Sequence, residues 1–404
     1  MLRHGNLLYD CLVVSVVRRD SSIATGAARR ECDNPFLREV ATALRSGRVA
    51  VPGSRPVYAL HERVNGYGFG RVWFTTAGCR WARRGACTMC SYATAGRLDD
   101  HATVDAVRGA LRRLPAIEEI FIAPSGSMLD DGEVSPRLRH LLLGAAAAHP
   151  GVRSVVTEAR PEDVTPNRVT ELRAAGRGAR IAVGMGLESA SPLVLRYCIA
   201  KLAQPMRFAA AAEVLHAASC SVHMNVTLGA PFLNTEEAIE DAVASTRWAF
   251  EHGADEVVVF PINVRRGTVV HALHRLGAYK PPSLWSLVEV LLRLPPAVLH
   301  RTQIAWYRVY NDDGGGIVEH PTSCTKCRES VLEGLDNYRE APGSTALGRL
   351  DALRCSCRTV RREMSDARSA ILRGYELLAE ATGMQERWIQ LREETARGLE
   401  IVDG

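Results

Sequence analysis

Six apolar segments alternate with six amphipathic ones between residues 72 and 294, and this alternation limits the fold more than any other feature of the 404-residue chain. The apolar segments are short, nearly continuous runs, which is typical of strands covered on both faces. The segments between them repeat apolar residues at helical spacing. Strands that alternate with helices form βα units, so the sequence predicts an α/β fold with a parallel sheet. The predicted strands are 72–76, 119–123, 154–158, 180–185, 222–227 and 256–260, and the predicted helices are 103–114, 135–148, 167–175, 205–218, 235–252 and 282–294.

Polar and glycine-rich residues follow the ends of these predicted strands. In a βα barrel the chemistry lies at the carboxyl ends of the strands, so residues in these places would share one mouth. The pattern by itself does not distinguish an open sheet from a barrel. The residues at the strand ends are Cys79, Ser125, Gly126, Ser127, Glu158, Glu188, Gly229 and Asn263.

Segments on either side of this array are expected to extend it. A chain of this length can form one large domain with additions. A helix is predicted for 34–47, a further strand for 301–310 and a charged helical tail for 364–401. We therefore expect an N-terminal extension with a helix (1–60), a partial barrel (61–310), a cysteine-rich metal-binding segment (311–360) and a helical tail (361–404).

The composition indicates a cytoplasmic protein. No apolar run reaches the length of a membrane span, and the run 12–17 is too short for a signal peptide. Eleven cysteines in such a chain point to metal binding or catalysis more than to disulfides. The formal net charge of +5 is mild for a nucleic-acid-binding protein, so it permits a basic face without establishing one.

Three cysteines lie close together just after the first predicted strand. Cys79, Cys87 and Cys90 have the spacing C-x7-C-x2-C. Three thiolates close in sequence can hold three irons of a cubane cluster and leave the fourth iron open to a small molecule. A zinc site without a local fourth ligand and three unrelated thiols are the alternatives. Four other cysteines are scattered and are expected to be packing residues or incidental thiols: Cys11, Cys32, Cys198 and Cys220.

A cysteine loop after the first strand of a βα array resembles the radical S-adenosylmethionine (SAM) superfamily. The subgroup that it resembles contains the radical SAM subunit of archaeosine synthase, with the Elongator catalytic subunit as a more distant relative. The usual spacing there is C-x3-C-x2-C, so the seven-residue gap is a departure. Short stretches that agree with the subgroup occur in the expected order over residues 61–310, at 76–81, 89–92, 158–162, 184–189, 228–232 and 260–264.

This resemblance implies a partial (β/α)6 TIM-type barrel with a 4Fe–4S cluster on Cys79, Cys87 and Cys90. SAM would bind the open iron through its amino and carboxylate groups. An electron donor of the flavodoxin or ferredoxin type would reduce the cluster, and SAM would split to give a 5′-deoxyadenosyl radical. That radical would remove a hydrogen atom from the substrate, while the protein positions the cofactors and excludes water.

The resemblance also assigns contacts with SAM at two strand ends. Ser125, Gly126 and Ser127 stand where the family has a small turn that meets the SAM amino group, although the first residue is Ser instead of the more common Gly. Glu158 and Arg160 resemble the pair that contacts the ribose and the carboxylate. An ordinary turn and a rim salt bridge are the alternative interpretations of these residues.

Three further positions complete this predicted SAM site. Glu188 would make a polar contact with SAM, Met89 would lie beside the adenine, and Asn225 would line the site. Each has a simpler interpretation, as a helix N-terminal charge, a packing residue and an ordinary strand-end polar residue. Side chains that hold the substrate are expected after the sixth strand, at Asn263, Arg265, Arg266 and His271.

A second group of cysteines follows the barrel. Cys324, Cys327, Cys355 and Cys357 combine a C-x2-C pair with a tighter C-x-C pair. A structural zinc, an auxiliary iron–sulfur cluster and free thiols all remain open, and His320 is a candidate replacement ligand. Residues 333–353 offer little apolar surface, so a metal would be needed to close this region. The first pair also resembles the zinc-bearing stretch after the barrel in the Elongator family.

Two functions from different classes fit these observations. The first is a radical SAM enzyme that acts on a modified nucleoside, an amino-acid adduct or a natural-product intermediate, whether a small molecule or linked to tRNA. The second is an iron–sulfur and zinc protein that binds nucleic acid and performs no productive SAM chemistry. In that case basic residues beside the metal loops would contact phosphates: Arg80, Arg83, Arg84 and Lys326.

Overall fold

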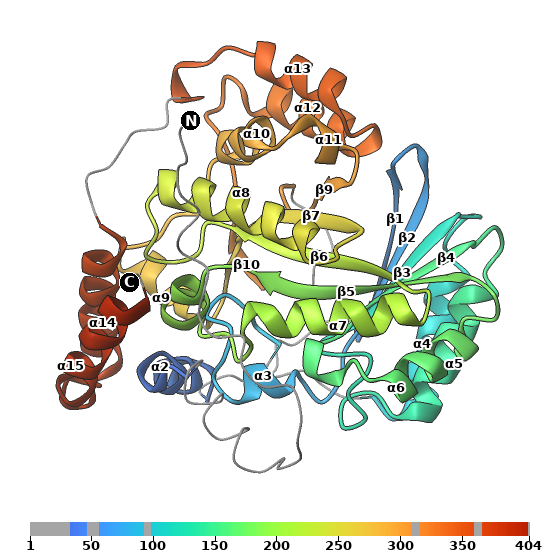
Figure 1. Cartoon of the computed structure of the whole chain (residues 1–404), viewed down its shortest axis with the longest axis horizontal. Coiled ribbons are helices and arrows are strands. Elements are labelled where there is room, and N and C mark those ends of the chain that lie inside the picture. The colour runs from blue at the N-terminus through green and yellow to red at the C-terminus, as the bar shows by residue number, and fades with distance from the viewer. Residues whose placement is uncertain (1–32, 47–55, 93–97, 309–315, 359–365, 403–404) are drawn as a thin grey trace, which may run out of the picture.

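A computed structural model of the chain describes residues 33–46, 56–92, 98–308, 316–358 and 366–402 (Figure 1). The expectations for residues 1–32, among them those for Cys11, Cys32 and the apolar run 12–17, lie outside these ranges. The last two residues of the strand predicted for 301–310 lie outside them as well.

An eight-stranded sheet forms the centre of the molecule. Its strand order is β1-β2-β3-β4-β5-β6-β7-β9, and every neighbouring pair from β2 onward is parallel. The sheet curls into an open half-barrel (Figure 1), so the predicted α/β partial barrel of the TIM type is confirmed. The strands are β1 (Val57–Val64), β2 (Tyr67–Phe74), β3 (Glu119–Pro124), β4 (Ser154–Glu158), β5 (Arg180–Glu188), β6 (Ser221–Leu228), β7 (Glu256–Pro261) and β9 (Thr302–Ile304).

The edge strand β1 was not predicted from the sequence. It pairs with β2 in an antiparallel hairpin whose turn residues, Asn65 and Gly66, both have positive φ. Gly68 and Gly70 weaken the strand pattern of β2, which is why the prediction began only after them. Gly70 is needed for packing, because a Cβ at this position would collide with the side chain of Ile117.

Helices follow the strands and cover the outer face of the half-barrel (Figure 1). Five of their starts lie within two residues of the predictions, helped by caps such as Ser135 before α5 and the capping box of Asn234 and Glu237 before α8, whereas α4 begins three residues earlier than predicted, at the cap Asp99. These helices are α4 (Asp100–Leu111), α5 (Pro136–Ala147), α6 (Pro166–Ala175), α7 (Pro205–Ala217), α8 (Thr235–Glu251) and α10 (Leu284–Arg293). No helix in the described ranges is both long and apolar enough to cross a membrane.

Shorter elements lie in the connections between these strands and helices. They are α3 (Arg80–Arg83), η1 (Pro161–Asp163), η2 (Val194–Ile199), α9 (Val269–Arg275), α11 (Pro296–Leu299) and η3 (Ser356–Arg358). β8 (Val264–Arg265) and β10 (Ile317–Glu319) pair in a small separate sheet. After the barrel come α12 (Arg328–Glu340) and α13 (Ser344–Ala352), which pack against α10.

A second hydrophobic core lies beside the core of the barrel. It joins α2 (Pro35–Ser46) to the C-terminal helices α14 (Ala367–Thr382) and α15 (Gln385–Val402) and to the segment around η2. The ring of Phe36 lies 5.2 Å from that of Tyr375 and 5.0 Å from that of Trp388. The two ends of the described chain therefore meet on one side of the barrel (Figure 1). Cys198 is buried in this core and Cys220 in the barrel core.

Candidate functional site

A cavity of about 300 Å³ lies inside the half-barrel and reaches the cysteine loop. Cys79, Cys87 and Cys90 all line it. Six of the eight residues predicted to contact SAM also line it: Met89, Gly126, Glu158, Arg160, Glu188 and Asn225. Ser125 and Ser127 do not, because both side chains turn into the protein and are fully buried.

The cysteine loop is held together by its own backbone. The Cys79 amide donates to the Tyr92 carbonyl at 2.8 Å, which brings the start and the end of the loop together. The Tyr92 amide donates to the Cys90 sulfur at 3.4 Å. Cys87 has a φ of 62°, a conformation that residues with a side chain seldom adopt. Strained backbone of this kind persists where the surrounding structure enforces it, often at functional sites.

A π-helical turn, η2, supports the loop from behind. Its C-terminal carbonyls have no partner within the turn, and the loop supplies donors for them. The Thr88 amide donates to the Ile199 carbonyl at 2.9 Å, and the Thr88 hydroxyl donates to the Cys198 carbonyl at 2.8 Å. Turns of this type occur often at functional sites. The loop and the turn thus form one hydrogen-bonded unit.

The donor set of the loop fits an iron–sulfur cluster. Burial raises the pKa of the Cys87 thiol to about 12 and that of the Cys90 thiol to about 11. A metal that binds these sulfurs must displace their protons, and iron–sulfur clusters are held in this way by cysteine thiolates. Amide donors to the sulfurs, such as that of Tyr92, are one means by which a protein tunes such a cluster.

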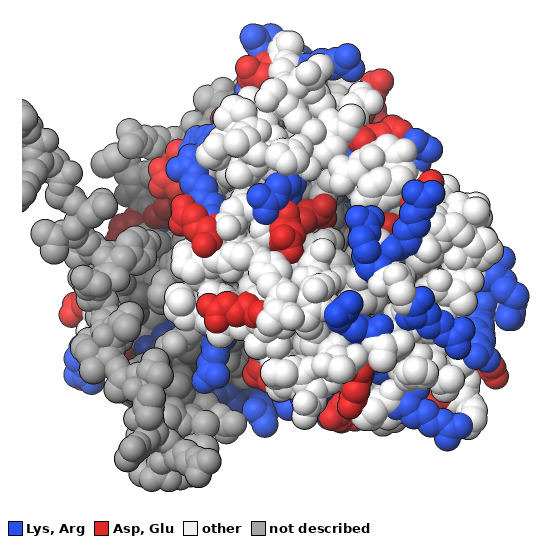
Figure 2. Space-filling view, turned by 45° about the vertical axis from the view of Figure 1, so that its right-hand side comes forward, with Lys and Arg blue, Asp and Glu red and all other residues white. Residues whose placement is uncertain are grey.

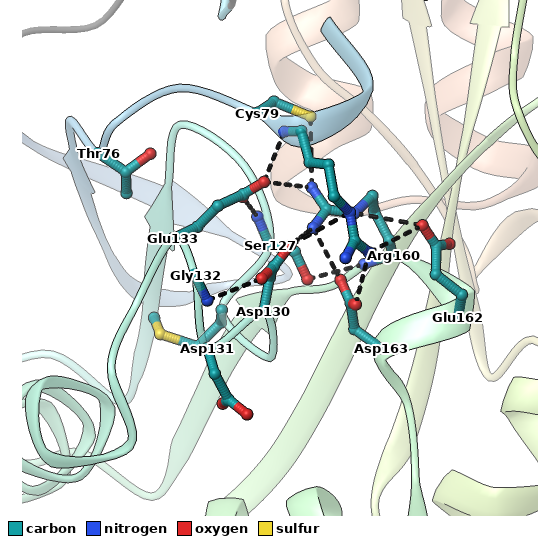
Figure 3. A network of polar contacts seen from close by, with 12 residues as sticks. Thr76, Cys79, Ser127, Asp130, Asp131, Gly132, Glu133, Arg160, Glu162 and Asp163 are labelled. Carbon is teal, nitrogen blue, oxygen red and sulfur yellow. Dashed lines mark hydrogen bonds and ion pairs between the residues drawn. The ribbon is translucent and has the colours of Figure 1, made fainter. Parts of the chain in front are cut away.

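Arg160 lies at the centre of a network of carboxylates beside Cys79 (Figure 3). Its guanidinium donates to Glu133 at 2.7 Å, pairs with Asp130 and also reaches the Cys79 sulfur at 3.4 Å. Asp163, at 2.9 Å, and Glu162, at 3.4 Å, complete the set. Burial by itself would lower the pKa of Arg160, but Glu133 and Asp163 outweigh it and raise the pKa. The guanidinium is therefore already supplied with carboxylate partners.

Glycine is required at position 126 by this same network. A Cβ there would collide with the Glu133 carboxylate, which accepts hydrogen bonds from the amides of Ser127 and Arg80. The Ser125 hydroxyl accepts a hydrogen bond from the Thr76 amide at 2.9 Å, and the Ser127 hydroxyl accepts one from the Arg160 amide. These serines therefore fix the turn, and the backbone of Gly126 faces the cavity.

Two carboxylates and an amide enter the cavity from neighbouring strands. The Asn225 amide donates to Glu158 at 3.0 Å, and burial raises the pKa of Glu158. Glu188 follows a bulge at the end of β5 and has a φ of 68°, which turns its side chain into the cavity. One of its carboxylate oxygens, Oε2, is buried without a hydrogen-bond partner.

Lys201 completes this group, and the sequence analysis missed it. Its ammonium lies 3.0 Å from Glu188 and 5.1 Å from the centre of the Trp81 ring. Burial would lower the pKa of Lys201, but the Glu188 carboxylate outweighs it and raises the pKa, so the side chain is cationic. The available signal was a single lysine in the apolar run that follows the fourth predicted strand. A buried cation of this kind needs a partner, and a cavity-facing one is a candidate ligand contact.

Cations and aromatic rings line the part of the cavity near β9. The Arg71 guanidinium lies within 5.2 to 5.7 Å of the rings of Phe69, Phe121 and Trp306, and Arg265 lies 5.4 Å from Trp306. Asn263 donates to the Trp306 carbonyl at 3.2 Å, and its Oδ1 is buried without a partner.

Two of the four predicted substrate residues are in this region. Asn263 and Arg265 line the cavity, whereas Arg266 and His271 do not.

The four later cysteines form a compact group on the other side of β9, at the start of α12. Their sulfurs lie within 4.8 Å of one another, with Cys324 3.4 Å from Cys355 and Cys327 3.4 Å from Cys357. Hydrogen bonds from Cys357 and Cys355 lower the pKa of Cys324. Four thiolates at this spacing match a tetrahedral metal site. His320 is not part of this group.

The expectation that this region has little apolar surface is wrong. Val331, Leu335, Leu347 and Leu350 are buried in the main core, between α12, α13 and α10. Tyr338 is fully buried as well, and its hydroxyl donates to the carbonyls of β9 and α11. In each of the two short helices the apolar residues lie on one face. The number of apolar residues in the sequence therefore understates the apolar surface that is buried when these faces pack against a third helix.

Comparisons with known proteins identify the family. No family model matches the chain. It is 30% identical over 294 residues to archaeosine synthase subunit beta from Methanosarcina acetivorans, a match that covers 71% of this chain and 82% of that protein. The chain belongs to the archaeosine synthase subunit beta family. The protein of the same name from Thermococcus kodakarensis is 34% identical over 224 residues, covering 54% of this chain and 69% of its own length. The recognition made from the sequence is thereby confirmed.

Solved structures to which the chain is similar include a radical S-adenosylmethionine methyltransferase, TsrM, from Kitasatospora setae, which aligns with a TM-score of 0.42 and 12% identity over 70% of this chain and 60% of that chain. The archaeal Elp3 of Methanocaldococcus infernus aligns with a TM-score of 0.42 and 16% identity, over 58% of each chain.

Proposed function

We propose that this family member is a radical SAM enzyme that cleaves SAM reductively and removes a hydrogen atom from a substrate held in the half-barrel. One observation carries the proposal. Three cysteines open into the same cavity as a glycine turn, two carboxylates, an amide and a buried lysine. A purely structural metal site has no need of a lined cavity, whereas an open iron with a bound small molecule requires one.

The residues predicted for the site have three kinds of role. Cys79, Cys87 and Cys90 would hold a 4Fe–4S cluster, which supplies the electron that splits SAM into methionine and a 5′-deoxyadenosyl radical. Five of the residues predicted from the sequence would bind SAM directly through the backbone or side chain: Met89, Gly126, Glu158, Glu188 and Asn225. Ser125, Ser127 and Arg160 would act by fixing the turn and the start of the loop, since their polar groups already have protein partners.

Lys201 is the group best suited to a carboxylate in this cavity. It is cationic and buried, and its one carboxylate partner, Glu188, keeps a second oxygen without a hydrogen bond. A ligand with an amino and a carboxylate group could pair its carboxylate with Lys201 and its amine with Glu188. The α-amino and α-carboxylate groups of the methionine part of SAM have this chemistry.

The substrate would lie against Arg71 and Trp306. Aromatic rings and guanidinium planes suit a planar, electron-rich group, and the named activity of the relatives is the synthesis of archaeosine. We therefore propose a modified nucleoside or its amino-acid adduct as the substrate class. A flavodoxin- or ferredoxin-type protein would donate the electron, and the divisions 1–60, 61–310, 311–360 and 361–404 would act as extension, barrel, metal segment and tail.

The four later cysteines would hold one zinc ion with a structural role. Their mutual distances suit a single ion, and no part of the cavity lining includes them. A closed set of four thiolates leaves no open position for catalysis.

The nucleic-acid-binding alternative has less support. Arg80, one of its expected phosphate contacts, is paired with Asp163 at 3.0 Å and Asp130 at 3.4 Å. On the face in Figure 2, basic side chains are scattered among uncharged and acidic ones and do not form a continuous stripe.

The test is anaerobic reconstitution with iron and sulfide, followed by incubation with SAM and dithionite. We expect 5′-deoxyadenosine from the wild type and none from Cys87→Ala. Cys220→Ala is the matched control, because Cys220 is buried in the barrel core away from the cavity. A wild type that holds a four-iron cluster yet forms no 5′-deoxyadenosine, with or without candidate nucleosides and tRNA, would refute the proposed function.

A further inference from the structure

Arg45 holds the cysteine loop from outside the barrel. It lies in the last turn of α2, and only 6% of its surface is exposed. Its two terminal nitrogens donate to four backbone carbonyls of the loop, those of Ala82 at 2.6 Å, Ala86 at 3.0 Å, Cys87 at 2.8 Å and Cys90 at 3.0 Å. Two of these carbonyls belong to the cysteines themselves. The planar fork of a guanidinium can reach several acceptors at once in a fixed geometry.

This arginine has no carboxylate partner among the described residues. Its neighbours in the structure are carbonyl dipoles, and its Nε is buried without a hydrogen bond. A buried charge without an ionic partner is costly, so four carbonyls must be kept oriented toward it. Arg160 differs, because its charge is matched by the carboxylates of Asp130, Glu133 and Asp163.

The rest of α2 packs against the long gap between Cys79 and Cys87. Gly85 has a φ of 82°, and a Cβ at this position would collide with the Arg38 carbonyl of α2. Arg38 in turn donates to the Arg84 carbonyl at 2.8 Å. Residues within the seven-residue gap, such as Ala82 and Gly85, therefore contact α2. A longer loop has more conformational freedom to lose, and this helix restricts it.

We propose that Arg45 is a positioning residue that fixes the conformation of the cysteine loop and raises the reduction potential of a cluster bound there. The first part stands on the geometry alone, and the second rests on the proposed function. A fixed positive charge without a matching carboxylate favours the more negative, reduced form of a nearby cluster. The N-terminal helix would then be part of the redox site.

Three variants test the proposal: Arg45→Met removes the charge and the fork, Arg45→Lys keeps only the charge, and Arg387→Met is the control. Arg387 pairs with Glu39 on the outer side of α2, at 2.8 Å. The first measurement is amide hydrogen exchange of full-length protein before reconstitution. We expect exchange of the Cys87–Tyr92 amides to rise about tenfold or more in both Arg45 variants and to stay unchanged in the control. Unchanged exchange in both Arg45 variants would overturn the positioning role.

The second measurement is a redox titration of the reconstituted proteins followed by electron paramagnetic resonance. At a fixed potential, we expect Arg45→Met to lower the ratio of reduced to oxidised cluster about tenfold, about 59 mV for a one-electron couple. Arg45→Lys should retain most of the wild-type potential. An unchanged potential in Arg45→Met would overturn the electrostatic part.

Failure of the proposed function gives a different pattern. A wild type that takes up no cluster would remove the electrostatic part of the inference, yet the exchange result would still decide the positioning role. Metal bound at the four later cysteines serves as a folding control, because the elements that α2 mainly packs against in the described residues, α9, α14 and α15, do not carry those cysteines. If Arg45→Met loses this metal, the exchange test is made on Arg45→Lys alone. This variant keeps the charge but not the planar fork. Loop amides that stay protected from exchange in Arg45→Lys would overturn the positioning role.

Discussion

The two cysteine groups use the same side chain in contrasting surroundings. The loop of Cys79, Cys87 and Cys90 opens into a cavity and is held by Arg45, Arg160 and η2. The group of Cys324, Cys327, Cys355 and Cys357 contacts mainly itself, through sulfur–sulfur distances of 3.4 to 3.6 Å. One group leaves room for a ligand, whereas the four thiols of the other lie close enough together to bind one ion.

This difference shows that the number of thiols matters less than what surrounds them. The loop cysteines depend on supports from distant parts of the chain: α2, the turn before α7 and the segment after β4. The later group is built from one helix start and one short turn, and Arg358 anchors that turn to Asp351 at 2.6 Å and to Glu289 at 3.3 Å. A reactive centre requires this wider support, because its ligands must keep one geometry while a small molecule binds beside them.

Replacing one cysteine of each group should give the largest difference in the rate of SAM cleavage. Cys90→Ala removes a loop ligand, so we expect the rate of SAM cleavage to fall by well over the roughly 100-fold that changes around metal ligands cost. Cys357→Ala removes a ligand of the later group and should leave the rate within about a factor of ten of wild type. The measurement is 5′-deoxyadenosine formed per bound cluster. Equal losses in both variants would mean that the two groups do not differ in role.

Removing the metal from the later group should mainly affect stability. A zinc ion present at about 100 times its dissociation constant stabilises the folded state by about 2.7 kcal/mol, and a chelator would remove this contribution. We expect α12 and α13 to unfold at lower denaturant concentration, while amide exchange in β3 to β6 stays unchanged. Val331 and Leu350 remain buried, so the region should not unfold completely. Loss of SAM cleavage in step with the metal would contradict a separate structural role.

Replacing Lys201 should have a smaller effect, and it tests SAM binding in the cavity beside the loop of Cys79, Cys87 and Cys90. Lys201→Met should weaken SAM binding about tenfold, which is about 1.4 kcal/mol, because the cavity would lose the buried cation beside Glu188. Lys201→Arg should restore part of the affinity, and Lys280→Met, which alters an exposed lysine, should have no effect. Equilibrium binding of SAM to the reconstituted protein is the measurement. An affinity that is unchanged in Lys201→Met would exclude a carboxylate contact at this position.

Much of the fold follows from local patterns in the sequence. In the apolar runs that became β3 to β7, every residue except the first of β5 and of β6 is buried or half-buried, so the apolar composition of these runs identifies them. The caps at Ser135 and Asn234 fix helix starts through hydrogen bonds to residues three positions away. Strand-end positions such as Glu158 and Glu188 could be named because parallel strands bring their carboxyl ends to one edge. The two cysteine groups were visible from spacing.

Tertiary structure decided the rest, and the reason is distance along the chain. Arg45 contacts Cys87 across 42 positions, and Lys201 reaches Glu188 only because a π-helical turn ends between them. Asp163 lies three positions after Arg160, but Asp130 and Glu133 come from a separate loop, so no local pattern records the full set of carboxylates around this arginine. The sequence by itself determined the parallel α/β array, the order of its strand-end residues and the presence of two thiol groups. Only packing decided which charges face the cysteines, because the energy of a buried charge depends on neighbours that the fold brings together.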